Sequence, residues 1–289
     1  MTKRETLRSI ASIAAAAFSP PPGGRYLEAP GGVRLHYTVE GDGPPVILIH
    51  GLAVDNRLNW RWSGIVNALA PRFTVISMDV RGHGRSSKPY DSKLYGIEMV
   101  DDVVRLMDHL GYAKVHVAGY SMGAFITMKL LARHPDRIIC AAPCAAGWSK
   151  PEGRNLHVLE TLPESLDQGR GFGPLLEYVN GMNVKHPFPP LWFVDRLLKA
   201  MNDVKALAAL IRSFTELVLS EEEVRGIRTP VLSIVGDIDP LKEGIDNMMG
   251  VLPNHEVAVI GGADHVTAIR SGEFPVLLES FLLKHRSYV

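Results

Sequence analysis

The sequence of 289 residues has only two cysteines, Cys140 and Cys144, and no excess of charge of either sign. Two cysteines are too few for a disulfide framework. Both stand in an apolar stretch that indicates a buried strand, so we interpret them as reduced packing residues. Lysine plus arginine and aspartate plus glutamate are equal at 31 each, which leaves no summed field to attract nucleic acid or an anionic membrane surface. We therefore expect the partner to be a small molecule in a pocket.

Long apolar runs are also lacking, since none reaches the roughly 18 residues needed to cross a bilayer. The N-terminus is open to two interpretations. Three basic residues precede a short apolar stretch at 10–18, which is the layout of an export signal, but Glu5 and the alanine run also fit an amphipathic terminal helix. Residues 1–24 are therefore set apart as a leader or terminal helix with a linker, and a cytoplasmic location is slightly favoured over export.

What the sequence does have is enough apolar content, 46%, to bury a full-sized core. Short apolar runs alternate with segments of helical period, which predicts an α/β fold with a mostly parallel sheet and helices on both faces. The eight expected strands are residues 26–29, 33–39, 46–50, 73–78, 115–119, 138–146, 231–235 and 256–260. The first two form an antiparallel hairpin across Pro30-Gly31-Gly32. The expected helices are residues 59–69, 97–110, 122–133, 244–251 and 275–285.

The alternation is interrupted at residues 148–228, which contain helix-like stretches at 191–201 and 207–219 but no convincing strand. About 80 residues is far longer than an ordinary connection, and long insertions at a sheet edge usually bear on a binding site. We therefore predict a core of residues 25–147 and 229–289 with an inserted helical cap.

A serine flanked by glycines lies between an expected strand and an expected helix. In Gly119-Tyr120-Ser121-Met122-Gly123, glycine stands two residues before and two residues after the serine. A sharp strand-to-helix turn lifts such a serine out of the sheet, and small flanking residues are needed because neighbouring chains pass close by. The positive end of the helix dipole would favour the negative charge that develops as an acyl group is attacked. Ser121 is the candidate nucleophile; the simpler alternative is a glycine-rich turn with a capping serine.

A second feature is His50-Gly51-Leu52, at the end of the expected strand 46–50. Glycine lets the chain turn there, so that the backbone N–H of Leu52 can face the pocket beside that of Met122. Two such donors would make an oxyanion hole. We interpret His50 as a hydrogen-bonding scaffold residue.

Five motifs together resemble the α/β-hydrolase superfamily. They are HGL at 50–52, DVRGHGRS at 79–86, GYSMG at 119–123, GDID at 236–239 and GADH at 262–265, and they occur in order over about residues 27–284. The resemblance is closest to capped esterases, cofactor-free haloperoxidase-like enzymes and carbon-carbon bond hydrolases. It implies an eight-stranded α/β-hydrolase fold in which His265 is the base and Asp239 the acid, with Asp237 as the second choice.

Such a triad has a physical reason. A serine hydroxyl is a poor nucleophile until a base takes its proton, and neutral imidazole can do so near pH 7. The aspartate fixes the tautomer and stabilises the imidazolium that forms. Among the other histidines, His83 in the Arg-Gly-His-Gly loop could approach the site, although a structural role in that loop is the stronger interpretation.

Departures from related patterns narrow the chemistry. Dehalogenases and epoxide hydrolases of this superfamily carry aspartate where Ser121 stands, which disfavours both activities. Carbon-carbon bond hydrolases commonly have asparagine before the nucleophile and tryptophan after the histidine, where this chain has Tyr120 and Val266. The His-Glu-x-x-His motif, clustered cysteines and phosphate-loop spacing are all missing, so no metal or cofactor is expected.

The expected function is cleavage of a small to medium, apolar carboxylic ester through an acyl-enzyme. Trp148 and Trp192 are candidate substrate contacts, although both could instead pack cap helices onto the core. A perhydrolase or a carbon-carbon bond hydrolase using the same triad is the first alternative. A small-molecule receptor without turnover is the second. The sequence leaves the oligomeric state and the natural substrate open.

Overall fold

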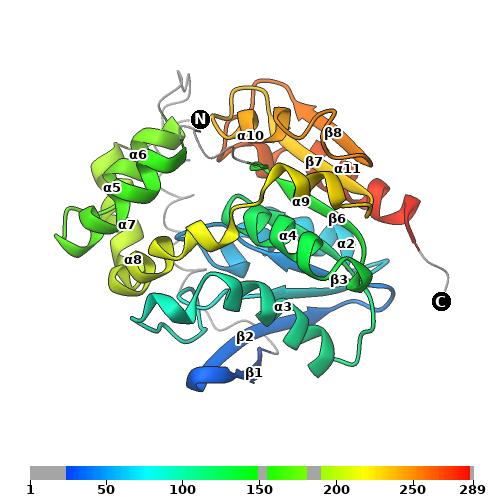
Figure 1. Cartoon of the computed structure of the whole chain (residues 1–289), viewed down its shortest axis with the longest axis horizontal. Helices are drawn as coiled ribbons and strands as arrows, with labels where there is room; N and C mark the ends of the chain where they lie inside the picture. The colour runs from blue at the N-terminus through cyan, green and yellow to red at the C-terminus, as the bar shows by residue number, and fades with distance from the viewer. Residues whose placement is uncertain (1–23, 149–154, 181–189, 287–289) are drawn as a thin grey trace.

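The chain forms one sheet of eight strands within the residues that the computed structural model describes, which are 24–148, 155–180 and 190–286. The strands are β1 (Arg25–Ala29), β2 (Val33–Glu40), β3 (Pro45–Ile49), β4 (Thr74–Met78), β5 (Val115–Tyr120), β6 (Ile138–Cys144), β7 (Val231–Gly236) and β8 (His255–Ile260). Their order across the sheet is β1-β2-β4-β3-β5-β6-β7-β8 (Figure 1). This arrangement confirms the predicted fold class.

The strand directions follow the predicted pattern. β1 and β2 pair antiparallel across a 3-10 turn at Pro30–Gly32, and β2 pairs antiparallel with β4. From β4 to β8 every neighbouring pair is parallel. The carboxyl ends of β3, β5, β7 and β8 therefore all lie at one edge of the sheet, which is where ligand sites form in open parallel sheets.

Both faces of the sheet are covered by helices, as the apolar strands require. Helices α3 (Ile97–His109) and α4 (Met122–Arg133) pack on one face, and α2 (Ile65–Leu69) and α11 (Glu273–Lys284) pack on the other. Strand β3 shows the period of two: Ile47 and Ile49 join the apolar cluster of α3 and α4, whereas Val46 and Leu48 join that of α2 and α11.

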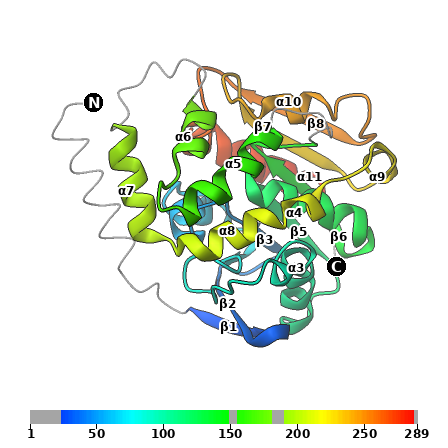
Figure 2. The same ribbon diagram turned by 60° about the vertical axis from the view of Figure 1, so that its left-hand side comes forward.

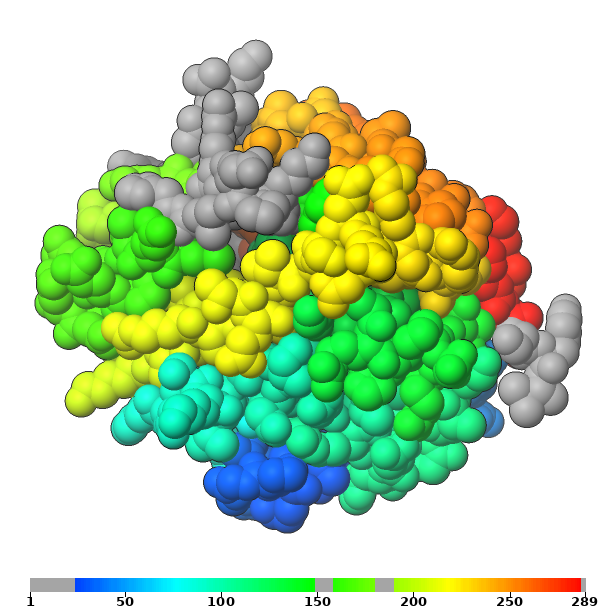
Figure 3. Space-filling view, viewed as in Figure 1, coloured from blue at the N-terminus to red at the C-terminus, as the bar shows by residue number. Residues whose placement is uncertain are grey.

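Between β6 and β7 the described residues form helices and no strand. They are α5 (Asn155–Asp167), α6 (Gly173–Asn180), α7 (Leu191–Met201), α8 (Val204–Arg212), the 3-10 turn η5 (Phe214–Leu217) and α9 (Glu221–Gly226). Helices α5 to α8 stand together beside the sheet (Figures 1 and 2), and we call them the helical insertion. The chain then returns through η5 and α9, drawn in yellow across the face shown in Figure 3.

Local side chains explain where two of these helices begin. Asp203 accepts hydrogen bonds from the N–H groups of Lys205 and Ala206 at the start of α8. Ser220 forms a capping box with Glu223 at the start of α9. Of the described helices, none is long and apolar enough to cross a membrane.

The expected single helix 59–69 is wrong. The segment is a π-helical turn (Arg57–Arg61) followed by α2, and Gly64 between them has a φ of 82°. That left-handed conformation, which glycine adopts without steric cost, ends one helix and redirects the chain into the next. Two further expected helices differ in their bounds: 244–251 is the shorter α10 (Lys242–Asp246), and 207–219 is divided into α8 and η5.

Buried imidazoles make stability depend on pH. Burial lowers the pKa of His116, in the centre of the sheet, to about 4, and that of the partly buried His255 to about 4. An unfolded histidine titrates near about 6.5, so below that pH the unfolded chain binds protons that the folded chain does not. We therefore expect the free energy of unfolding to fall as the pH is lowered from about 6.5 towards 4.

Urea unfolding at pH 7 and pH 5 measures this effect. For His116 alone the expected loss is about 2 kcal/mol. A His116→Gln variant should have a smaller difference between the two pH values than the wild type. Stability that is equal at pH 7 and pH 5 would contradict the prediction.

Candidate active site

The candidate site is built from the loops that follow four of the five parallel strands from β3 to β8 in the sheet. Ser121 follows β5, Leu52 follows β3, Asp239 follows β7 and His265 follows β8. These residues are distant in sequence, and the strand order alone brings their loops to the same edge of the sheet. These four loops therefore form a single site.

Ser121 occupies a sharp turn between β5 and α4. Its φ is 54° and its ψ is −113°, a conformation that residues other than glycine rarely adopt. A Cβ at Gly119 would overlap the carbonyl oxygen of Gly123, and a Cβ at Gly123 would overlap the carbonyl oxygen of Ile49. Glycine is thus required at both flanking positions, and the turn holds the serine at the amino end of α4.

His265 lies between Ser121 and Asp239. Its Nε2 atom is 3.0 Å from Ser121 Oγ, and its Nδ1 atom is 2.9 Å from Asp239 Oδ2. An ionised carboxylate can only accept, so Nδ1–H donates to Asp239 and Nε2 is left to accept the proton of the serine hydroxyl. Asp239 is 4% exposed and its Oδ1 accepts from the N–H of Leu241. Asp237, the second choice, is exposed.

Two residues that the sequence reasoning did not assign to the site hold the loop of His265. The hydroxyl of Tyr120 donates to the carbonyl oxygen of His265 at 2.7 Å. The buried Asp264 carboxylate accepts from the N–H groups of Val266 and Thr267 and from the Thr267 hydroxyl. Asp264 belongs to the GADH motif, and Tyr120 adjoins the serine, so both stood in recognised motifs.

The loop that carries Leu52 is held by two buried histidines. His50 donates from Nδ1 to the carbonyl oxygen of Gly51 at 2.7 Å and accepts at Nε2 from the N–H of Val80. His83 accepts at Nε2 from the N–H of Ala53 at 3.1 Å. Burial lowers the pKa of both imidazoles, which keeps these ring nitrogens unprotonated and able to accept. The structural roles expected for His50 and His83 are therefore the roles they have here.

These contacts leave one N–H of the loop unused. Gly51 N–H donates to Asn59 Oδ1, and Ala53 N–H donates to His83. Neither Leu52 N–H nor Met122 N–H has a hydrogen-bond acceptor among the described residues. The loop is also close to the serine, because a Cβ on Gly51 would lie 3.4 Å from Ser121 Cβ. The two free donors are those expected for an oxyanion hole.

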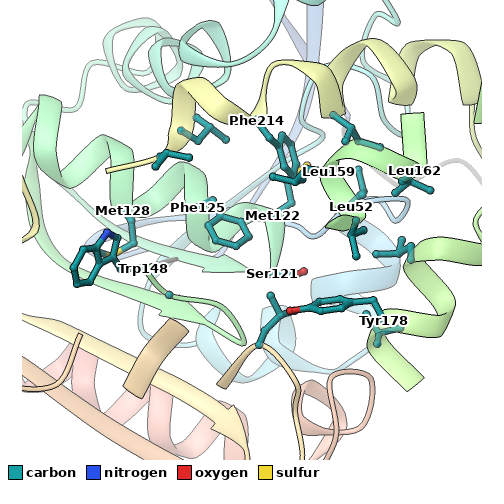
Figure 4. A pocket seen from close by; sticks show the side chains of 18 of the residues that line it. Leu52, Ser121, Met122, Phe125, Met128, Trp148, Leu159, Leu162, Tyr178 and Phe214 are labelled. Atoms are coloured by element: carbon teal, nitrogen blue, oxygen red, sulfur yellow. The ribbon is translucent and has the colours of Figure 1, made fainter. Parts of the chain in front are cut away.

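A pocket of about 1080 Å³, counting the part open to solvent, begins at Ser121 and extends under the helical insertion (Figure 4). Its lining is almost wholly apolar. The residues around it are Leu52, Ser121, Met122, Phe125, Met128, Gly147, Trp148, Val158, Leu159, Leu162, Leu175, Tyr178, Val179, Ile211, Phe214, Leu217, Val218, Leu219 and Leu241. Within residues 24–148, 155–180 and 190–286, no three histidine, cysteine, aspartate or glutamate residues gather into a possible metal site.

The structure separates the two tryptophans proposed as substrate contacts. Trp148 lines the pocket and is also packed in the core, so its contact with a substrate stays a prediction. Trp192 is 68% exposed on α7 and is not among the residues that line the pocket, which corrects its assignment. Several apolar residues follow one another at the start of α7, so the sequence did not indicate which of them faces solvent.

Comparison with known proteins agrees with this architecture. The family model described as "alpha/beta hydrolase fold" matches residues 44–270. A soluble epoxide hydrolase from Corynebacterium sp. strain C12 is 30% identical over 200 residues, covering 67% of this chain and 62% of the relative. The chain is also similar to a carboxylesterase structure from Nitrososphaera gargenis, with 22% identity, coverage of 90% and 98% and a TM-score of 0.75. An enol-lactonase structure from Burkholderia xenovorans LB400 has 25% identity, coverage of 90% and 100% and a TM-score of 0.74.

The chain belongs to the alpha/beta hydrolase fold family. The matches span less than two thirds of the length of the first curated relatives, at 62% and 52%. Membership of the family and the eight-stranded fold are thus established.

Proposed function

We propose that this protein is a serine hydrolase that cleaves carboxylic esters through an acyl-enzyme. The observation that carries the proposal is the chain of contacts from Ser121 Oγ to His265 Nε2 at 3.0 Å and from His265 Nδ1 to Asp239 at 2.9 Å. An imidazole beside the hydroxyl, with a buried carboxylate behind it, is the arrangement in which the imidazole can act as the base, and this supports the proposal. The likeness to an enol-lactonase structure supports the same class of chemistry.

The first half of the reaction forms the acyl-enzyme. Ser121 Oγ attacks the ester carbonyl carbon while its proton passes to His265 Nε2, and the carbonyl oxygen becomes an oxyanion that accepts from Leu52 N–H and Met122 N–H. Collapse of this intermediate breaks the bond to the alcohol oxygen, which takes the proton from Nε2 and leaves as the alcohol. Asp239 accepts from Nδ1–H throughout and stabilises the imidazolium.

The second half releases the acid. A water molecule gives a proton to His265 Nε2 as its oxygen attacks the acyl carbon. The second tetrahedral intermediate expels Ser121 Oγ, which takes that proton back. The product is the carboxylic acid, and the enzyme returns to its starting protonation state.

Epoxide hydrolysis, the activity named for the Corynebacterium relative, does not suit this nucleophile. Epoxide hydrolases of the family use an aspartate, whose attack gives an ester that water can cleave. Attack by Ser121 on an epoxide would give an ether, which the triad has no means of hydrolysing. The serine therefore favours an acyl substrate.

The direct test is turnover of p-nitrophenyl butyrate. We expect saturable release of p-nitrophenol and butyrate in equal amounts. A separate assay for peracid, with hydrogen peroxide added, would detect the perhydrolase alternative. A protein that binds the ester but releases no more product than a heat-denatured sample would be a receptor rather than a hydrolase, and the proposal would be withdrawn.

The loop held by His83 allows a kinetic prediction. His83→Ala removes the acceptor of Ala53 N–H, so the adjacent Leu52 N–H should lose its fixed direction. Because that donor acts on the oxyanion, kcat should fall about ten- to a hundredfold while KM changes by less than about threefold. His134→Ala, at the end of α4, is the control and should keep wild-type kcat. An equal loss in both variants would remove the special role of His83.

A further inference from the structure

One arm of the pocket runs along helix α4, starting at the serine. Met122, Phe125 and Met128 follow Ser121 at intervals of one, four and seven residues and all line the pocket. At about 1.5 Å per residue, the stretch from Met122 to Met128 extends about 9 Å along the helix. We call this space the α4 arm. Figure 4 shows Met128 and Trp148 on one side of Ser121, with Leu159 and Leu162 on the other side.

The indole ring of Trp148 lines the pocket and lies beside Met128 at the far end of the α4 arm (Figure 4). Trp148 is 4% exposed, and its Nε1–H donates to the carbonyl oxygen of Leu219 at 2.9 Å. Above α4, the chain returning from the helical insertion forms the opposite wall, where Phe214 faces Phe125 with a ring-centroid distance of 6.5 Å. An indole held by its own hydrogen bond and by packing is a defined end wall.

The lining of the arm decides what it can accept. No aspartate, glutamate, lysine or arginine is among the described residues around the pocket. A charged group on the substrate would lose its hydration there without gaining a partner, so its binding is disfavoured. The arm therefore suits an uncharged hydrocarbon chain.

The position of His265 indicates which portion of the ester, acyl or alcohol, occupies the pocket. The imidazole must give its proton to the leaving alcohol oxygen, so the alcohol portion lies on the side of His265. His265 contacts Ser121 but is not among the residues that line the pocket, whereas the oxyanion candidates Leu52 and Met122 are. The acyl portion is then directed away from the imidazole and into the pocket.

We propose that the α4 arm binds a linear acyl chain of medium length and that Trp148 and Met128 set its limit, an inference that rests on the proposed ester hydrolysis. With a carbon-carbon bond of about 1.5 Å, an extended chain advances about 1.25 Å per carbon, so a space of about 9 Å holds about seven carbons. The substrate class is thus uncharged esters of acids of about six to eight carbons.

Measurement of kcat/KM over p-nitrophenyl esters from acetate to palmitate tests the arm. The wild type should have its maximum between hexanoate and octanoate and fall at least tenfold by palmitate. Met128→Phe should narrow the arm and move the maximum to butyrate or shorter. Trp148→Ala should remove the end wall and move the maximum to decanoate or longer. Met107→Phe enlarges a buried methionine on α3 that does not line the pocket, so it should keep the wild-type maximum.

The outcomes separate the two proposals. If a fluorophosphonate labels Ser121 and the esters are turned over, but the maximum does not move in Met128→Phe, the acyl arm is overturned and ester hydrolysis stands. If there is neither labelling nor turnover, both proposals fail. Should Trp148→Ala fail to fold by circular dichroism, Met128→Phe against Met107→Phe still decides the question.

Discussion

Replacing Ser121 by alanine is expected to lower kcat/KM for p-nitrophenyl butyrate by about 10⁵-fold or more, because the proposed mechanism then has no atom that can form the acyl-enzyme. The remaining rate would come from water attacking an ester held by the pocket and by the Leu52 and Met122 N–H groups. Among the described residues, the Ser121 hydroxyl forms one hydrogen bond, to His265, whereas the turn itself is held by backbone hydrogen bonds. The variant should therefore fold.

The comparison needs a serine of no proposed function. Ser92 begins the 3-10 turn Ser92–Leu94, is half-buried and is not among the residues that line the pocket, so Ser92→Ala should retain wild-type kcat/KM. Circular dichroism and thermal unfolding of the two variants exclude a folding defect. More than about 1% of wild-type activity in purified Ser121→Ala would contradict the assignment of the nucleophile.

Asp239→Asn should have the second largest effect, a fall in kcat of about 10⁴-fold, the size of the effect of the corresponding change in serine proteases. The amide nitrogen of asparagine would donate to His265 Nδ1, so the ring proton would move to Nε2. An Nε2 that carries a proton cannot accept the proton of Ser121, although the three side chains would keep their positions.

A neighbouring aspartate supplies the control. Asp237 is exposed and lies two residues earlier in the same loop, and Asp237→Asn should change kcat by less than about twofold. Steady-state kinetics of both variants with p-nitrophenyl butyrate decide between the two carboxylates that the sequence left open. A larger loss in Asp237→Asn than in Asp239→Asn would reverse their roles.

The sheet was predictable because each strand is marked by residues that are close together in the sequence. Each strand is a short apolar run, and in β3 the residues face alternately into the two core clusters that cover the sheet. The turn at Ser121 was predictable for the same reason, since the two flanking glycines relieve overlaps with the next turn of α4 and with the end of β3. Such requirements leave a pattern of residue types within a few positions.

The pocket was harder to predict because its contacts join distant parts of the chain. The indole of Trp148 bonds to Leu219, 71 residues away, and the hydroxyl of Tyr120 bonds to His265, 145 residues away. Helices α5 and α6 supply one side of the pocket and were not recognised individually; α5 has Pro163 within it, a residue that usually ends a helix. Spacing on α4 could have indicated Phe125 and Met128, which follow the serine by one and two helical turns.

The most direct test of the mechanism is to identify which atom a reactive phosphonate modifies. The wild-type protein and the variants His265→Ala and Ser121→Ala are each treated with a fluorophosphonate, and the adduct is located by peptide mass spectrometry. The triad predicts one adduct, on Ser121, formed much more slowly in His265→Ala and not at all in Ser121→Ala. An unmodified wild-type protein, or an adduct on any other residue, would contradict the proposal that the imidazole of His265 activates this hydroxyl.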